Sequence, residues 1–323
     1  MKRIAPPTQH RERGAALLTA MIIVTLVATL SAAMVWQQWR AVQIESAERA
    51  RLQSAWILNG ALDWAKLILR EDAKASAQVD HLGEPWAVPL AEARLSTFLA
   101  VDKNNADDAP EAFLSGSITD AQSRYNLRNL IDQNAIVPAE LEGLKRLFQA
   151  INVAPDLAVT IAEGLRGALA PPDSNNKSAN APLMPQSIEQ LAWLGIDAES
   201  VQKMEAYVVL LPERTAVNVN TAPKEVLVAA IDNLDLGTAE RMVQTRQRQP
   251  FKTLDDIKAV LPATTAQSLS QARAFVVSKF FEVRGRLRLE DRVLEESSLV
   301  ERRGIDIIPL SRRREMSREA LSG

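Results

Sequence analysis

The chain is poor in the residues that most often carry chemistry. Its 323 residues include no cysteine, which excludes disulfides, thiolate metal sites and cysteine nucleophiles. Only two histidines are present, His10 and His81, and His10 lies in a basic N-terminal segment, so a serine–histidine–carboxylate triad would depend on His81. The net charge of −2 argues against a general attraction to nucleic acid or acidic lipid. No convergent polar site is evident, and we expect no enzyme activity.

Charge is also absent from residues 15–35, an apolar run that follows the short basic segment 1–14. At about 1.5 Å per residue, a helix over this run covers roughly 30 Å, the thickness of a bilayer core. The alternative is a secretory signal peptide cut after Ala33, but such apolar regions usually span about 7–15 residues. The run therefore predicts a transmembrane helix, with its basic flank in the cytoplasm and the remaining chain on the outer side.

The helical pattern continues past the apolar run. Apolar residues recur at helical spacing as far as Ile68, and neither proline nor glycine interrupts the chain from Ala15 to Asn59. This pattern predicts one continuous helix from about Ala15 to Arg70, roughly 80 Å long. Its first half is compatible with lipid, and its second half is amphipathic.

In the rest of the chain, the spacing of apolar residues changes twice, from that of strands to that of helices and back. Residues 116–127 predict two short strands around a polar turn. The region 138–277 is helical, with residues typical of helix starts at Asp197, Thr221 and Thr253. Residues 281–289 alternate apolar and polar, and 293–300 and 305–310 add candidate strands around Gly304. The basic residues beyond Leu310 predict a disordered tail over 311–323.

An internal repeat lies within the helical region. Residues 187–209 parallel residues 253–277, which implies two similar helical units over about 138–211 and 219–277. Segments 217–227 and 250–257 also resemble helix-hairpin-helix modules, which hold phosphate on a glycine-rich hairpin. Here the hairpin has a single glycine, Gly237, with Asp232 and Asp235 where phosphate would approach. We therefore expect a protein-contact domain, with membrane-anchored DNA binding or uptake as the alternative.

Metal binding has one candidate segment. Residues 102–108 are acidic enough to suggest calcium, but they lack the ligand spacing and the glycine of an EF-hand loop. An exposed, solvated loop is the favoured interpretation, and we expect no other cofactor.

Several motifs together resemble a known family. The segment 11–14 (RERG) before Ala15 resembles the class III signal of type IV pilins and pseudopilins. Thr19 stands at the fifth mature position, where most pilin-like proteins have glutamate, and this loss is the mark of the K-type minor pseudopilin of type II secretion. Segment 116–130 is similar to the family pattern G-x-I-x-D-x-x-x-R-(F/Y)-N-(L/I)-N-x-L, except that Arg128 replaces an asparagine.

The resemblance implies a fold and a function. The fold would be α+β: a pilin-like long helix and antiparallel sheet, with an inserted helical domain of two repeats that resemble SAM-like or helix-hairpin-helix modules. The implied parts are a leader (1–14), a transmembrane segment (15–35), a pilin-like domain (36–137 and 279–310), the insertion (138–278) and the tail (311–323).

The implied processing is cleavage by prepilin peptidase between Gly14 and Ala15, with N-methylation of Ala15. The implied place is the inner membrane in a single pass, with the C-terminal domain in the periplasm. The chain would cap the pseudopilus tip beside I- and J-type minor pseudopilins and support export across the outer membrane. The secretin and the exported substrate are further candidate partners, and nucleic acid is not expected.

Overall fold

The computed structural model describes residues 12–76, 79–95, 112–169, 182–289 and 292–318. It contains two compact units, Met1–Ile57 and Leu58–Gly323. The described part of the first unit consists of helix α1, which spans Glu12–Ser76 and extends into the second unit. The predicted continuous helix is therefore confirmed, and its length agrees with the absence of proline and glycine from Ala15 to Asn59.

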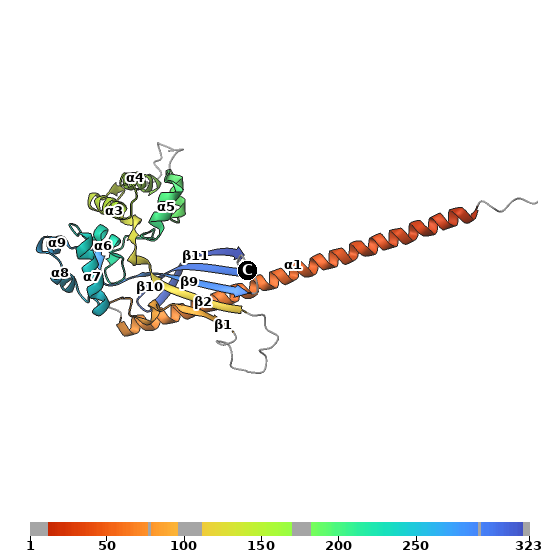
Figure 1. Cartoon of the computed structure of the whole chain (residues 1–323), viewed down its shortest axis with the longest axis horizontal. Coiled ribbons are helices and arrows are strands. Elements are labelled where there is room, and N and C mark those ends of the chain that lie inside the picture. Colours follow the sequence, from red (N-terminus) through yellow and green to blue (C-terminus); the bar gives the residue numbers. More distant parts are fainter. Residues whose placement is uncertain (1–11, 77–78, 96–111, 170–181, 290–291, 319–323) are drawn as a thin grey trace, which may run out of the picture. The chain divides into compact units, whose positions relative to one another are not determined.

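The second unit contains a five-stranded antiparallel sheet in the order β1-β2-β9-β10-β11 (Figure 1). Its strands are β1 (Leu90–Arg94), β2 (Ala112–Asp120), β9 (Phe280–Leu289), β10 (Arg292–Arg303) and β11 (Asp306–Arg318). A short 3-10 turn, η1 (Pro85–Ala87), precedes β1.

The C-terminal part of α1 packs on this sheet through a small apolar core. Leu62 and Leu69 of α1 are buried with Trp86 of η1 and with Phe281 of β9. The Trp86 and Phe281 rings meet edge to face, with their centroids 5.2 Å apart. This long helix on an antiparallel sheet confirms the predicted pilin-like architecture.

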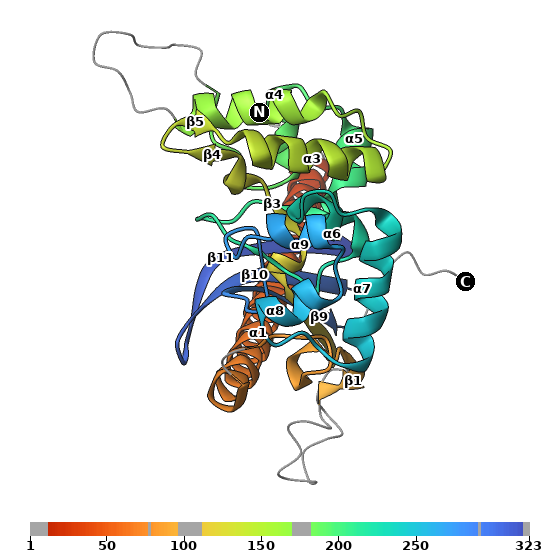
Figure 2. The same cartoon turned by 90° about the vertical axis from the view of Figure 1, so that its left-hand side faces the viewer.

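Residues 121–279 separate β2 from β9, its neighbour in the sheet, and form two helical units that appear as two groups in Figure 2. After the connecting turn η2 (Ala121–Ser123), the first helical unit contains β3 (Tyr125–Asn126), η3 (Leu127–Leu130), β4 (Ile131–Asp132), β5 (Ala135–Ile136), α3 (Pro138–Ala150), α4 (Leu157–Leu169), η4 (Glu189–Leu194), α5 (Ala198–Glu205) and β6 (Val208–Val209). The second contains β7 (Val217–Asn218), α6 (Lys224–Ala230), α7 (Leu236–Arg248), α8 (Leu254–Ala259), α9 (Ala263–Ser268) and β8 (Ala274–Phe275).

In each helical unit, a short strand at the start pairs with a short strand at the end. In the first, β3 pairs in parallel with β6, and in the second, β7 pairs in parallel with β8. Each unit therefore begins and ends with a two-residue strand, an arrangement that agrees with the repeat in the sequence. Because β3 belongs to this pairing, the first unit begins at Tyr125 rather than near residue 138.

Segment 116–127 contains two strands around a turn, as predicted, namely the end of β2 and the short β3. The two strands do not pair with each other, because β2 joins the large sheet whereas β3 pairs with β6. One local prediction was wrong. Residues 311–318 are not a disordered tail, because they belong to β11 and pair with β10. The basic residues there are neutralised locally: Arg312 and Arg314 both contact the carboxylate of Glu296, which is only 3% exposed.

Candidate functional site: the anchor helix and the polar junction

The predicted processing and assembly residues all lie in the first turns of α1. Gly14, Ala15 and Thr19 are helical, and the Thr19 hydroxyl donates to the carbonyl of Ala15 at 2.8 Å. The helix is long and apolar enough to cross a membrane, with a mean hydropathy of 2.3 in its most apolar window. Thr19 therefore satisfies its polar group within the helix and brings no charge into the apolar segment.

A second candidate site is a buried polar network where α1, the sheet and the helical insertion meet. We call this network the polar junction and define it by the following residues: Asp72, Asp80, Asp120, Asn218, Ser278 and Arg302. These residues come from five separate parts of the sequence.

Asp120, at the end of β2, accepts hydrogen bonds from both ends of the second helical unit. Its Oδ2 accepts from Asn218 Nδ2 at 3.0 Å, from the Thr221 hydroxyl at 2.6 Å and from the Ser278 hydroxyl at 2.6 Å. Its Oδ1 accepts from the amide of Gln122 at 2.7 Å. Asp120 is only 2% exposed, and this burial raises its pKa to about 6 despite these donors.

Arg302 of β10 joins the sheet to the end of α1 and to the insertion. Its guanidinium donates to Asp72 at 3.0 Å, to both oxygens of Asp80 at 2.6 and 2.5 Å, and to the carbonyl of Ser278 at 2.7 Å. It also lies 4.9 Å from the centroid of the Phe281 ring. Ser278 in turn donates its amide to Asp80, so the Arg302 contacts and the Asp120 contacts form one continuous network.

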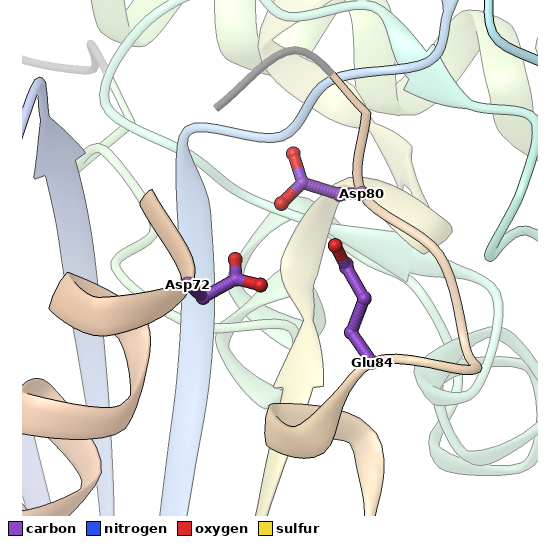
Figure 3. A group of neighbouring side chains, drawn as sticks. All are labelled: Asp72, Asp80 and Glu84. Atoms are coloured by element: carbon purple, nitrogen blue, oxygen red, sulfur yellow. The ribbon is translucent and has the colours of Figure 1, made fainter. Parts of the chain in front are cut away.

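Two carboxylates of the junction, Asp72 and Asp80, converge with that of the neighbouring Glu84 (Figure 3). Oxygens of Asp72, Asp80 and Glu84 lie within 4.8 Å of one another, and all three side chains are buried. Glu84 accepts from the Trp86 indole at 2.8 Å, whereas Arg302 contacts Asp72 and Asp80. A metal ion would have to compete with this guanidinium, so we assign the cluster a structural role. The acidic loop 102–108, where calcium was considered, lies outside the described residues.

Two asparagines of segment 116–130, which resembles the family pattern, make further contacts within the insertion. Asn126 donates to the carbonyl of Glu213 and accepts from the amide of Leu211, while Asn129 exchanges two hydrogen bonds with the backbone of Thr215. These amide side chains hold the linker between the two helical units. The motif residues therefore fasten the insertion rather than form an exposed reactive site.

Asp232 and Asp235, the carboxylates at the hairpin where DNA phosphate would bind in the alternative function, already have partners within the protein. Asp232 pairs with Arg146 at 2.7 Å and with Arg273 at 2.8 Å, which joins the two helical units. Asp235 caps α7 by accepting from the amide of Thr238 at 2.9 Å. His81 makes a local contact, since its Nδ1 accepts from the amide of Gly83.

Sequence reasoning located the helix caps only in part. Asp197 caps α5, and Thr253 forms a capping box with Asp256, as the sequence predicts. Thr221 does not cap a helix, because α6 begins at Lys224 and the Thr221 hydroxyl is bound to Asp120.

The polar junction was not predicted from the sequence, since its members lie far apart along the chain. Its one visible signal was the polar cluster within segment 116–130.

Comparisons with known proteins cover most of the chain. Two family models described as "Type II secretion system (T2SS), protein K" match residues 123–213 and 217–278. A Pseudomonas aeruginosa type II secretion system protein K is 27% identical and matches 87% of this chain and 86% of its own length. The Klebsiella pneumoniae protein K is also 27% identical, over 88% of this chain and 92% of its own length. This chain belongs to the type II secretion system protein K family.

A solved structure agrees with the fold. The fold of this chain is similar to that of a chain in the crystal structure of the GspK–GspI–GspJ complex from enterotoxigenic Escherichia coli, with a TM-score of 0.63 and 22% sequence identity. The match covers 84% of this chain and 99% of that chain. Protein K is a minor pseudopilin, a structural component of the secretion system, and the apolar part of α1 fits its single membrane anchor.

Removing the guanidinium of Arg302 tests the junction. We expect Arg302→Ala to lower the free energy of unfolding by about 3–5 kcal/mol, because it leaves buried carboxylates without their cation. The control is Arg303→Ala, since the Arg303 side chain is 60% exposed and pairs with Glu301 at the surface. Urea unfolding of both variants measures the difference. Equal stability of the two variants would contradict the assigned role.

The raised pKa of Asp120 predicts a pH effect on stability. Because the folded pKa is about 6 and the ordinary value is 3.8, the contribution of the protonated carboxyl is complete below about pH 4 and is lost as the pH rises through 6. The stability of the wild type relative to Asp120→Asn should fall over this window by on the order of 3 kcal/mol. Urea unfolding at several pH values measures it, with the exposed Asp132→Asn as control. A difference that is constant or rises with pH would refute the assignment.

Proposed function

We propose that this protein caps the tip of the pseudopilus, together with I- and J-type minor pseudopilins, and thereby supports export across the outer membrane. The observation that carries the proposal is the family membership together with the fold likeness to a chain solved in a complex with GspI and GspJ. The proposed assembly contact is lateral packing of α1, whose apolar side chains are exposed along residues 17–44.

The proposed life history begins in the inner membrane. Prepilin peptidase cleaves between Gly14 and Ala15, and Ala15 is then N-methylated. The basic leader lies in the cytoplasm, and the C-terminal domain lies in the periplasm, in agreement with the charge bias around the apolar segment.

Thr19 favours a position at the filament end. A glutamate in an apolar bundle needs a cation, which in major subunits is the amine of the preceding subunit. A terminal subunit has no such neighbour, so an uncharged Thr19 with an internal hydrogen bond avoids an unpaired carboxylate.

The helical insertion would prevent further stacking. Residues 121–279 form a large body, and the polar junction fixes both of its ends to the sheet by buried hydrogen bonds. A bulky domain held in this way is suited to ending a fibre. Its surface is the proposed contact for the secretin or the exported substrate. The DNA-binding alternative is not favoured, because Asp232 and Asp235 stand at its hairpin.

Leader removal gives the first test. We expect Gly14→Ala to leave nearly all of the protein with its leader in cells that contain prepilin peptidase, because the peptidase would recognise the glycine before the cut. Gly60→Ala is the matched control, since an added methyl at Gly60 meets no other atom within 4 Å. Immunoblotting and mass spectrometry of the N-terminus measure the outcome. Normal processing of Gly14→Ala would refute the proposal.

Partner binding gives the second test. The mature chain in detergent should co-purify with the I- and J-type pseudopilins of the same secretion system. Binding to duplex DNA should be weak, without the steep salt dependence that several phosphate contacts produce. Tight, salt-sensitive DNA binding without pseudopilin binding would favour the alternative.

A further inference from the structure

Two tryptophans form an exposed pair on the N-terminal part of α1, within the unit Met1–Ile57. Trp36 and Trp39 are 61% and 54% exposed, and their ring centroids lie 5.5 Å apart. Their spacing of three residues places both rings on one side of α1. Two large aromatic rings held together in this way present a substantial apolar surface that water does not solvate favourably.

The pair stands at a boundary in the helix. It directly follows the uncharged segment 15–35, and the next charged residue is Arg40. The segment before it is about one bilayer core in length, so a helix that starts at one face of the membrane reaches the other face near Trp36.

Side-chain hydrogen bonds change at the same boundary. Within the apolar segment, the hydroxyls of Thr25, Thr29 and Ser31 donate to carbonyls of the preceding turn, so they present no unsatisfied donor to lipid. Beyond it come Gln37 and Gln38, whose amides need water or headgroup partners. The tryptophan pair thus flanks the first two polar amides, at the place where a lipid-compatible segment changes to one that requires a polar surrounding.

We propose that Trp36 and Trp39 lie in the lipid headgroup region of the membrane face opposite the basic leader, and that they set the depth of the anchor helix. An indole suits this region because its ring is apolar while its N–H can donate to a headgroup or to water. The proposal rests on the proposed anchoring of α1. It places Trp56, about 30 Å further along the helix, outside the bilayer.

Depth-dependent fluorescence quenching tests the position. The mature full chain is placed in vesicles of phosphatidylethanolamine and phosphatidylglycerol that carry a nitroxide near the headgroup or at mid-chain. The headgroup-proximal label should remove the same absolute amount of tryptophan emission from the wild type and from Trp56→Phe, and the double variant Trp36→Phe/Trp39→Phe should lose most of this quenching.

The other outcomes separate the two claims. Stronger quenching by the mid-chain label would overturn the headgroup position but leave the anchoring intact. Quenching by aqueous iodide alone, with no effect of either lipid label, would overturn the anchoring itself and this inference with it.

A second measurement tests whether the pair sets the depth. Because the chain has no cysteine, Met34→Cys is a unique thiol inside the proposed boundary, and Gln43→Cys is a matched thiol outside it. In the vesicles, a water-soluble maleimide should modify position 43 and spare position 34. Adding Trp36→Gln/Trp39→Gln should increase modification at position 34 severalfold. An unchanged rate there would overturn the proposed role of the pair.

Discussion

The arrangement of the second unit depends on one buried network of charges and hydrogen bonds. Arg302 binds Asp72 and Asp80, Ser278 links Asp80 to Asp120, and Asp120 receives donors from the insertion. Buried carboxylates without partners are costly, so these groups are satisfied only when α1, the sheet and the insertion come together. The network therefore specifies how a large helical body attaches to a pilin-like sheet.

This attachment explains how a domain can be inserted between two adjacent strands. β2 and β9 are neighbours in the sheet, yet residues 121–279 lie between them in sequence. Asp120 at the end of β2 and Ser278 just before β9 are hydrogen-bonded to each other, so the insertion leaves and returns at one point. Its own core, with residues such as Leu144, is then free to form separately.

The anchor follows simpler physics. Its hydroxyls bond within the helix, its apolar residues are exposed, and the sequence from Ala15 onward contains no early helix breaker. The protein thus combines a segment matched to lipid with a folded body that relies on buried polar contacts. In the proposed function these two parts have different roles: the helix would pack among sibling helices, and the folded body would end the fibre.

The sequence by itself determined the features that arise from local periodicity and composition. The long helix, the strand at 280–289, the caps at Asp197 and Thr253 and the repeat all leave regular patterns along the chain, because each depends on neighbours within a few residues. Tertiary structure alone decided which strands β2 and β3 of segment 116–127 pair with, the pairing of β11 as far as Arg318 and the role of Thr221. Those outcomes depend on partners about a hundred residues away or on a neighbouring strand, and no local pattern encodes a hydrogen bond across such a separation.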